Sequence, residues 1–109
     1  MEAFLHEIEI YLTPNRRCPF TEWLNSLRDI RARAAIRVRL DRIRFGNFGD
    51  FKFLGEGLYE LRIHTGPGYR VYYGSIDSKI VLLLCGGDKH SQERDIRKAT
   101  EYWQDYLKL

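Results

Sequence analysis

The sequence has few cysteines and no long apolar run. Its 109 residues include two cysteines, too few for a disulfide framework or a cysteine-based metal centre. The longest apolar segment, Ile80 to Cys85, is six residues long and too short to cross a membrane. We therefore expect no membrane span, and we expect Cys85 to be a buried thiol in an apolar strand. The first residues also lack a basic segment followed by an apolar stretch, so no secretory signal is expected and the cytoplasm is the predicted location.

Signatures of cofactor-dependent enzymes are missing as well. The three histidines, His6, His64 and His90, are far apart, and none has a Cys/His spacing typical of a metal site. No nucleophile elbow, complete phosphate-binding loop or dinucleotide fingerprint occurs. We therefore expect neither a metal ion nor another cofactor.

The positive charge is concentrated in one segment. The formal net charge is only +3, but eight basic and three acidic residues lie between Arg28 and Lys52. The rest of the chain holds ten basic and twelve acidic residues. This asymmetry predicts an anionic partner, which is RNA, DNA or an acidic protein.

Hydrophobic periodicity predicts a single α+β domain over residues 1–109 with the order β-α-α-β-β-β-α. Strands are predicted over His6–Leu12, Leu58–His64, Tyr69–Gly74 and Lys79–Cys85, and helices over Pro19–Leu27, Asp29–Phe45 and from Ser91 onward. Ile8, Ile10 and Leu12 are expected on one buried face of the first strand. The segment Phe48–Gly57 contains three glycines and is predicted to be a loop.

Basic and aromatic residues alternate along two of the predicted strands. Arg62 and His64 are two positions apart and project from the same face, as do Arg70 and Tyr72 on the next strand. Lys89 follows Gly86–Gly87, where a long cation reaches into a cleft. Such a face is suited to hold a phosphodiester and to stack bases. The alternative interpretations are an ion pair of Arg62 with Glu60, a packed or surface histidine, and tyrosines that only fill the sheet.

The segments Gly49–Gly74 and Leu82–Trp103 resemble RelE/ParE-superfamily toxins, specifically the phage-derived addiction module killer proteins related to HigB. The resemblance extends over residues 4–106. It implies two N-terminal helices packed on a curved antiparallel sheet of about four strands, plus a C-terminal helix. It also implies a cognate antitoxin, usually of the helix-turn-helix type, and a bacterial intracellular setting.

Members of this superfamily differ in activity. RelE and HigB types cleave mRNA in the ribosomal A site without a metal, whereas ParE types inhibit DNA gyrase. Gly68–Tyr69–Arg70 matches the arginine motif of the RelE type, and Lys89 matches its basic residue after the last strand. Of the two cations on the preceding strand, one matches Arg62 and the other is replaced by Glu60.

The general base is less clearly matched. Asp95–Ile96 stands near the place of the tyrosine that acts as the base in RelE. HigB-like toxins use histidines and acidic residues in this region, and His64, Asp88 and His90 are the corresponding candidates here.

The sequence thus predicts a metal-independent, ribosome-dependent mRNA endoribonuclease that acts with the ribosome, mRNA and an antitoxin. The expected catalytic residues are Arg70, Arg62, His64, Lys89 and Asp88, and the expected RNA-binding residues are Lys52, Tyr72, His90, Arg33, Arg37 and Arg44. The arginines of the Arg28–Arg44 segment have the alternative of being a solvated helix flank. The alternative functions are a non-enzymatic gyrase inhibitor of the ParE type and a degenerate RNA-binding module.

Overall fold

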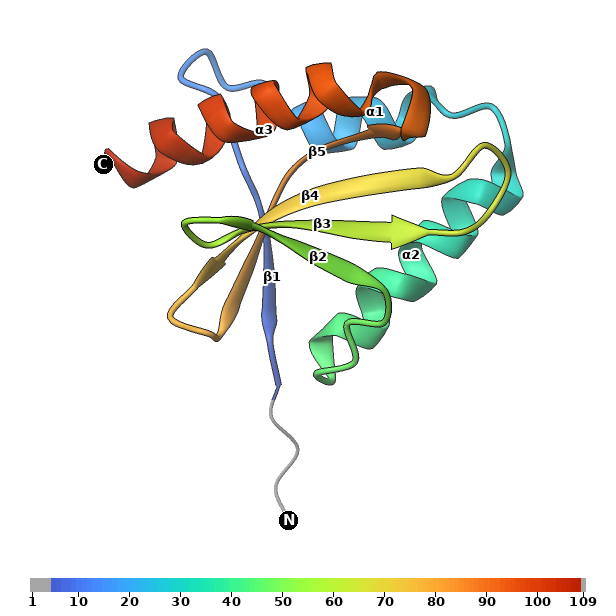
Figure 1. The fold of residues 1–109 in the computed structure, drawn as a ribbon, viewed down its shortest axis with the longest axis horizontal. Coiled ribbons are helices and arrows are strands. Elements are labelled where there is room, and N and C mark those ends of the chain that lie inside the picture. The colour runs from blue at the N-terminus through green and yellow to red at the C-terminus, as the bar shows by residue number, and fades with distance from the viewer. Residues whose placement is uncertain (1–4, 109) are drawn as a thin grey trace.

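The computed structural model describes residues 5–108. Its elements are β1 (Glu7–Ile10), α1 (Pro19–Ser26), α2 (Ile30–Arg44), β2 (Phe51–Gly55), β3 (Leu58–Ile63), β4 (Tyr69–Ile76), β5 (Ile80–Asp88), a short 3₁₀ turn η1 (Lys89–Ser91) and α3 (Gln92–Leu107) (Figure 1). The expected α+β class is confirmed.

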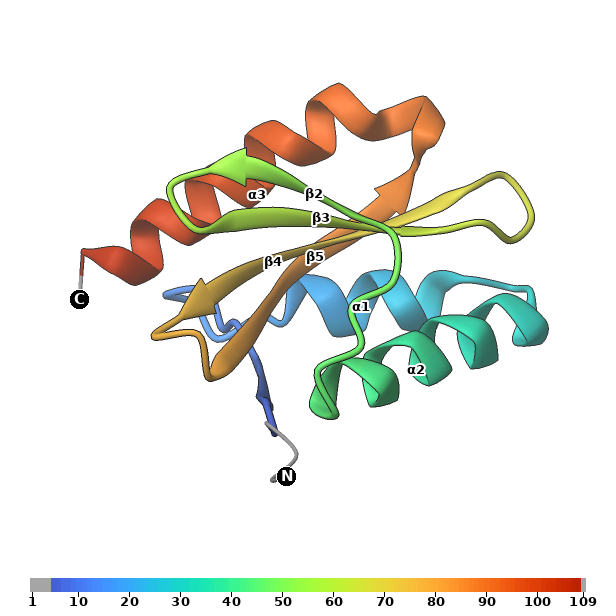
Figure 2. The same ribbon diagram turned by 60° about the horizontal axis from the view of Figure 1, so that its bottom comes forward.

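The strands form one mixed sheet in the order β1-β5-β4-β3-β2. Strand β1 runs parallel to β5, and the other neighbours are antiparallel. Helices α1 and α2 cover one face, and α3 covers the other (Figure 2). Each face of the sheet therefore has its own apolar core.

The expectation of about four antiparallel strands is wrong, because β1 runs parallel to β5 and the segment predicted as a loop contains β2. Gly55, Glu56 and Gly57 have φ values of 106°, 51° and 85° and form the tight turn between β2 and β3. Left-handed conformations of this kind favour glycine. The glycines therefore mark a hairpin turn and not an irregular segment.

Strand β1 is shorter than predicted. Ile8 packs against the core under α1 and α2, as expected. Ile10 and Leu12 are exposed, whereas Tyr11 is buried against the α3 side of the sheet. Ile10 belongs to β1 and Tyr11 faces the side opposite to Ile8, so the alternation holds, but β1 is an edge strand and the core beneath α1 and α2 does not extend to Ile10.

The amphipathic pattern of α2 is confirmed by its packing. Ala32, Ile36, Leu40 and Ile43 are all buried against the sheet. Asp29 caps the N-terminus of the helix, because its carboxylate accepts hydrogen bonds from two backbone amides of the first turn.

On the other face, two residues fix the position of α3. Trp103 is buried and its indole Nε1 donates to the carbonyl oxygen of Glu56 at 2.8 Å. A Cβ atom added to Gly74 would lie 2.1 Å from the Trp103 ring, so the ring lies directly on the backbone of β4. Cys85 is buried in the same core, which confirms that prediction, and burial raises the pKa of its thiol to about 12.

In the described part of the chain, no helix combines the length and the apolar character that crossing a bilayer requires.

Candidate functional site

Three basic residues meet where the β3–β4 turn approaches the end of β5. Arg62 on β3 is paired directly with Arg70 on β4, and Arg70 is paired with Gly87 on β5. A Cβ atom added to Gly68 would lie 3.5 Å from Nη1 of Arg70 and 3.7 Å from Cδ of Lys89. Both cationic side chains therefore flank Gly68, and the predicted association of Arg62, Arg70 and Lys89 is present in the fold.

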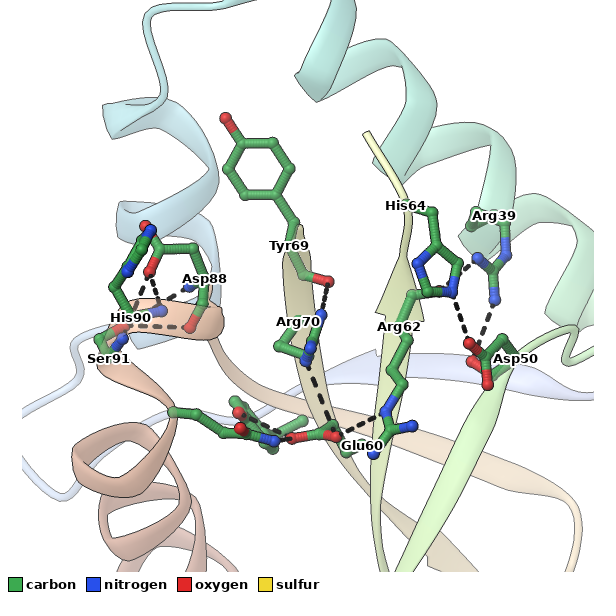
Figure 3. A network of polar contacts seen from close by, with 12 residues as sticks. Arg39, Asp50, Glu60, Arg62, His64, Tyr69, Arg70, Asp88, His90 and Ser91 are labelled. Atoms are coloured by element: carbon green, nitrogen blue, oxygen red, sulfur yellow. Dashed lines mark hydrogen bonds and ion pairs between the residues drawn. The ribbon is translucent and has the colours of Figure 1, made fainter. Parts of the chain in front are cut away.

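The buried carboxylate of Glu60 anchors this cluster (Figure 3). It accepts hydrogen bonds from Arg62 Nε at 3.0 Å, the Tyr72 hydroxyl at 3.1 Å and the Gln92 amide at 2.7 Å. Arg70 Nε lies 3.8 Å away as an ion-pair partner. Burial favours the neutral acid, but the hydrogen bonds from Gln92, Arg62 and Tyr72 hold the pKa of Glu60 below its ordinary value.

The two arginines are withdrawn from solvent to different extents. The side chain of Arg62 is 31% exposed and that of Arg70 is 13% exposed. Within residues 5–108, Arg70 Nε is buried and has no hydrogen-bond partner. Lys52 is exposed and lies opposite Glu60 on the edge strand, which places a further cation on the same face. Glu60 is the carboxylate that contacts the two arginines directly. A second buried carboxylate, that of Asp95, lies against Gly87, the β5 partner of Arg70.

His64 forms a separate pair with Asp50. Its Nε2 lies 2.5 Å from Oδ2 of Asp50, and both side chains are exposed to solvent. The hydrogen bond from His64 lowers the pKa of Asp50. When a neutral imidazole donates through Nε2, its Nδ1 becomes a proton acceptor. The pair thus has the arrangement of an oriented general base.

Arg39 connects α2 to this region. Its guanidinium donates to the carbonyl oxygens of Arg62 at 2.6 Å and Phe48 at 3.0 Å. These contacts hold the segment before β2 against the end of β3, and Arg39 lies beside His64 and Asp50 in Figure 3.

Asp88 has a structural role. Its Oδ1 accepts from the backbone amides of His90 at 2.8 Å and Ser91 at 3.3 Å, which caps η1. Oδ1 of Asp88 is therefore occupied by two backbone donors. His90 is exposed next to Lys89.

The prediction that Tyr72 lies on an exposed nucleic-acid surface is wrong. Its ring is 0% exposed, and its hydroxyl donates to Glu60 beneath α3. Strand alternation placed Tyr72 on the correct face, but α3 covers that part of the face. The ring is therefore not available to stack on a base.

The predicted basic residues of α2 do not join the cluster. Arg37 and Arg44 are exposed and Arg33 is half-buried. They belong to the helix that packs on the face opposite to Glu60. These three arginines lie along one flank of α2 and form a second basic surface, and the exposed Arg31 and Arg42 lie on its other flank.

Sequence reasoning missed several residues of the site. The segment that holds Asp50 was predicted to be a loop, so nothing in the sequence indicated that Asp50 lies next to His64. Gln92 reaches Glu60 across 32 positions of sequence, a contact that only the packing of α3 produces. Arg94 and Arg97 also line an open groove beside Lys89 and His90. Their spacing along α3 is that of any solvated helix face, so the sequence did not single them out.

We expect protonation of Glu60 to destabilise the protein in acid. Its pKa lies below the ordinary value of about 4.3, so its contribution is present above about pH 4.3 and is lost as the pH falls through the folded-state pKa. Urea unfolding between about pH 5 and pH 3 should therefore depend less on pH in Glu60→Gln than in the wild type. Contributions from other acids are shared by both proteins and cancel in the comparison. Equal pH dependence would contradict this assignment.

Fold and site together define a small α+β domain with a cationic cluster built on a buried carboxylate. The chain belongs to the same family as a protein of Haemophilus influenzae that is described as an uncharacterized protein. The two are 50% identical over 80 residues, which cover 73% of this chain and 81% of the relative. No protein-family model matches the chain.

Proposed function

We propose that this protein is the toxin of a type II toxin–antitoxin module, with a RelE-like fold, and that it cleaves mRNA on the ribosome without a metal ion. The observation that carries the proposal is the convergence of Arg62, Arg70 and Lys89 at one end of the sheet. Guanidinium groups bind phosphate bidentately and stay charged, so they suit a phosphodiester whose charge increases in the transition state.

The proposed reaction needs a base, an anion-binding site and an acid. Nδ1 of His64 takes the proton from a ribose 2′-hydroxyl, while Asp50 orients the ring. The 2′-oxygen forms a bond to the adjacent phosphorus, and the bond from phosphorus to the 5′-oxygen breaks. The Lys89 ammonium gives a proton to the leaving 5′-oxygen. The products are a 2′,3′-cyclic phosphate and a free 5′-hydroxyl.

Dependence on the ribosome follows from the exposure of the proposed base. The His64 side chain is 69% exposed just beyond the end of β3, so the protein alone fixes its position relative to RNA weakly. A ribosome that holds the mRNA in an in-line geometry would supply the missing orientation. The second basic surface on α2, with Arg33, Arg37 and Arg44, would contact ribosomal RNA through its phosphates.

The proposal includes the cytoplasm as the site of action and a helix-turn-helix antitoxin as the partner. Lys52 on one side of the cluster and His90 on the other would contact the flanking mRNA. Arg94 and Arg97 extend the cationic surface along the groove at the start of α3.

Inhibition of DNA gyrase is the second candidate, and the outer surface of α2 favours it. Ile30 and Val38 are exposed there among the arginines, a composition suited to protein binding. Induction of the protein in bacterial cells distinguishes the two functions. We expect incorporation of labelled amino acids to stop before an SOS reporter responds. An SOS response that precedes any loss of translation would favour gyrase, and unchanged growth would favour an inactive RNA-binding module.

His64 provides a prediction about the base. We expect His64→Ala to lower the rate of mRNA cleavage by about a hundredfold, because proton transfer from the 2′-hydroxyl would lose its acceptor. Cleavage of a defined mRNA on reconstituted ribosomes, compared for wild type and variant at one neutral pH, measures this loss. Asp50→Asn keeps the imidazole and should have a smaller effect. A wild-type rate in a folded His64→Ala protein would assign the base elsewhere.

A further inference from the structure

A carboxylate without exposed surface lies beneath the two arginines of the cluster. Glu60 is 0% exposed, and both of its oxygens are engaged by protein donors. Oε1 accepts from Arg62, and Oε2 accepts from Tyr72 and Gln92. A carboxylate so enclosed is not placed to take a proton from a substrate. Its effect must therefore pass through the side chains that surround it.

Arg62 and Arg70 require a counter-ion, because their register places two positive charges directly opposite each other. Like charges at such a cross-strand pair destabilise a sheet. The Nε atoms of Arg62 and Arg70 lie 3.0 Å and 3.8 Å from the same oxygen, Oε1 of Glu60. One carboxylate oxygen thus offsets the repulsion between both guanidinium groups.

The contacts with Glu60 use Nε and leave the terminal nitrogens of both arginines for other partners. Nη1 of Arg70 lies 3.5 Å from the carbonyl oxygen of Tyr69, which is a long and weak contact. Terminal nitrogens in a fixed plane are the donors that bind phosphate oxygens bidentately. Glu60 therefore holds the Arg62 guanidinium by a hydrogen bond at Nε and the Arg70 guanidinium by the longer ion pair at Nε, and neither contact uses a terminal nitrogen.

We propose that Glu60 is a positioning residue that sets Arg62 and Arg70 in one phosphate-binding geometry before a substrate arrives. The effect of Glu60 on the cleavage rate rests on the proposed function. Its effect on the positions of the two arginines does not depend on RNA. The amide of Gln92 fixes the second oxygen of Glu60, so α3 is the element that locks this geometry. Preorganised donors of this kind lower the barrier because they need no rearrangement during the reaction.

The kinetic test is Glu60→Gln, assayed on mRNA in a reconstituted translation system. We expect kcat to fall by about tenfold or more, because misplaced donors stabilise the transition state poorly. KM should change by no more than about threefold, because the cations that attract RNA remain. The matched control is Asp105→Asn, which makes the same change from carboxylate to amide. Asp105 accepts a hydrogen bond from the Tyr11 hydroxyl. This position is about 20 Å along α3 from Gln92, and its kcat should be unchanged.

The spectroscopic test reports on the arginines without RNA. In the wild type, the Nε–Hε NMR signals of Arg62 and Arg70 should be shifted from that of the exposed Arg37, and both should respond together to inorganic phosphate. In Glu60→Gln, both signals should move toward the Arg37 position while the backbone amide spectrum remains that of a folded protein.

The outcomes separate the inference from the proposed function. Shifted arginine signals in a protein that does not cut mRNA would refute the proposed function and support the role of Glu60. Unchanged signals and an unchanged kcat in Glu60→Gln would overturn the inference. If Glu60→Gln does not fold, the wild-type spectrum decides: signals of Arg62 and Arg70 at the Arg37 position would overturn the inference, and shifted signals that respond together to phosphate would support it.

Discussion

Replacing Arg70 with alanine is expected to lower the rate of mRNA cleavage by about a hundredfold or more, the effect of removing one preorganised donor to a developing charge. Arg70 is paired with Arg62 on β3 and with Gly87 on β5, and its side chain is only 13% exposed. Lysine lacks the planar donor set of a guanidinium, so Arg70→Lys should recover little activity.

The Arg70→Ala protein should remain folded. Glu60 would keep its hydrogen bonds from Arg62, Tyr72 and Gln92, so no buried charge loses its last partner. Cleavage by the purified variants, measured beside their thermal unfolding, tests this expectation. Lys79→Ala is the matched control, because Lys79 is an exposed cation in the turn at the other end of the β4–β5 hairpin. A folded Arg70→Ala protein with wild-type activity would remove Arg70 from the site.

Trp103→Ala is expected to have the largest effect on stability. The indole is 4% exposed, lies against Gly74 and donates a hydrogen bond to the carbonyl oxygen of Glu56. Its loss would leave a cavity between α3 and β4 and an unpaired carbonyl in the β2–β3 turn. We expect the free energy of unfolding to fall by about 3–5 kcal/mol, a large part of the stability of a small domain.

Urea unfolding at neutral pH measures this effect, and an exposed residue of the same helix provides the control. Leu107 is 55% exposed, so Leu107→Ala should change the free energy of unfolding by no more than about 0.5 kcal/mol. A loss below about 1 kcal/mol in Trp103→Ala would show that α3 does not depend on this contact. Because α3 carries Gln92, a detached helix would also release Glu60.

Elements whose signal is local were predicted well. The buried face of α2 follows from helical spacing, and its bounds differ from the predicted Asp29–Phe45 by one residue at each end. The antiparallel arrangement of β3 and β4 follows from the turn residues between two alternating segments. In each case the residues that determine the structure are close together in the sequence.

Features that depend on distant segments were not predicted. The pairing of β1 with β5 joins Glu7 to Ile80, and no pattern within either strand specifies the other. Strand β2 was missed because its bordering glycines are equally typical of a loop. The burial of Tyr72 depends on where α3 is placed, since alternation gives only the face of the strand and not what covers it.

The candidate site shows the same division. Sequence similarity and alternation selected Arg62, Arg70 and Lys89, which the fold does bring together. The carboxylate that connects the two arginines, and the amide that holds this carboxylate, come from elements 32 positions apart. Asp88 was selected as a candidate proton acceptor, but its carboxylate caps η1, a role that depends on a turn the periodicity does not reveal.

The most direct measurement maps the ends of a defined mRNA by primer extension after adding the purified protein to a reconstituted translation system. Omitting ribosomes and substituting Arg70→Ala are the two comparisons. The proposed function predicts cuts within codons in the ribosomal A site, absent without ribosomes and absent with the variant. Intact mRNA in an actively translating system containing the wild-type protein would contradict it.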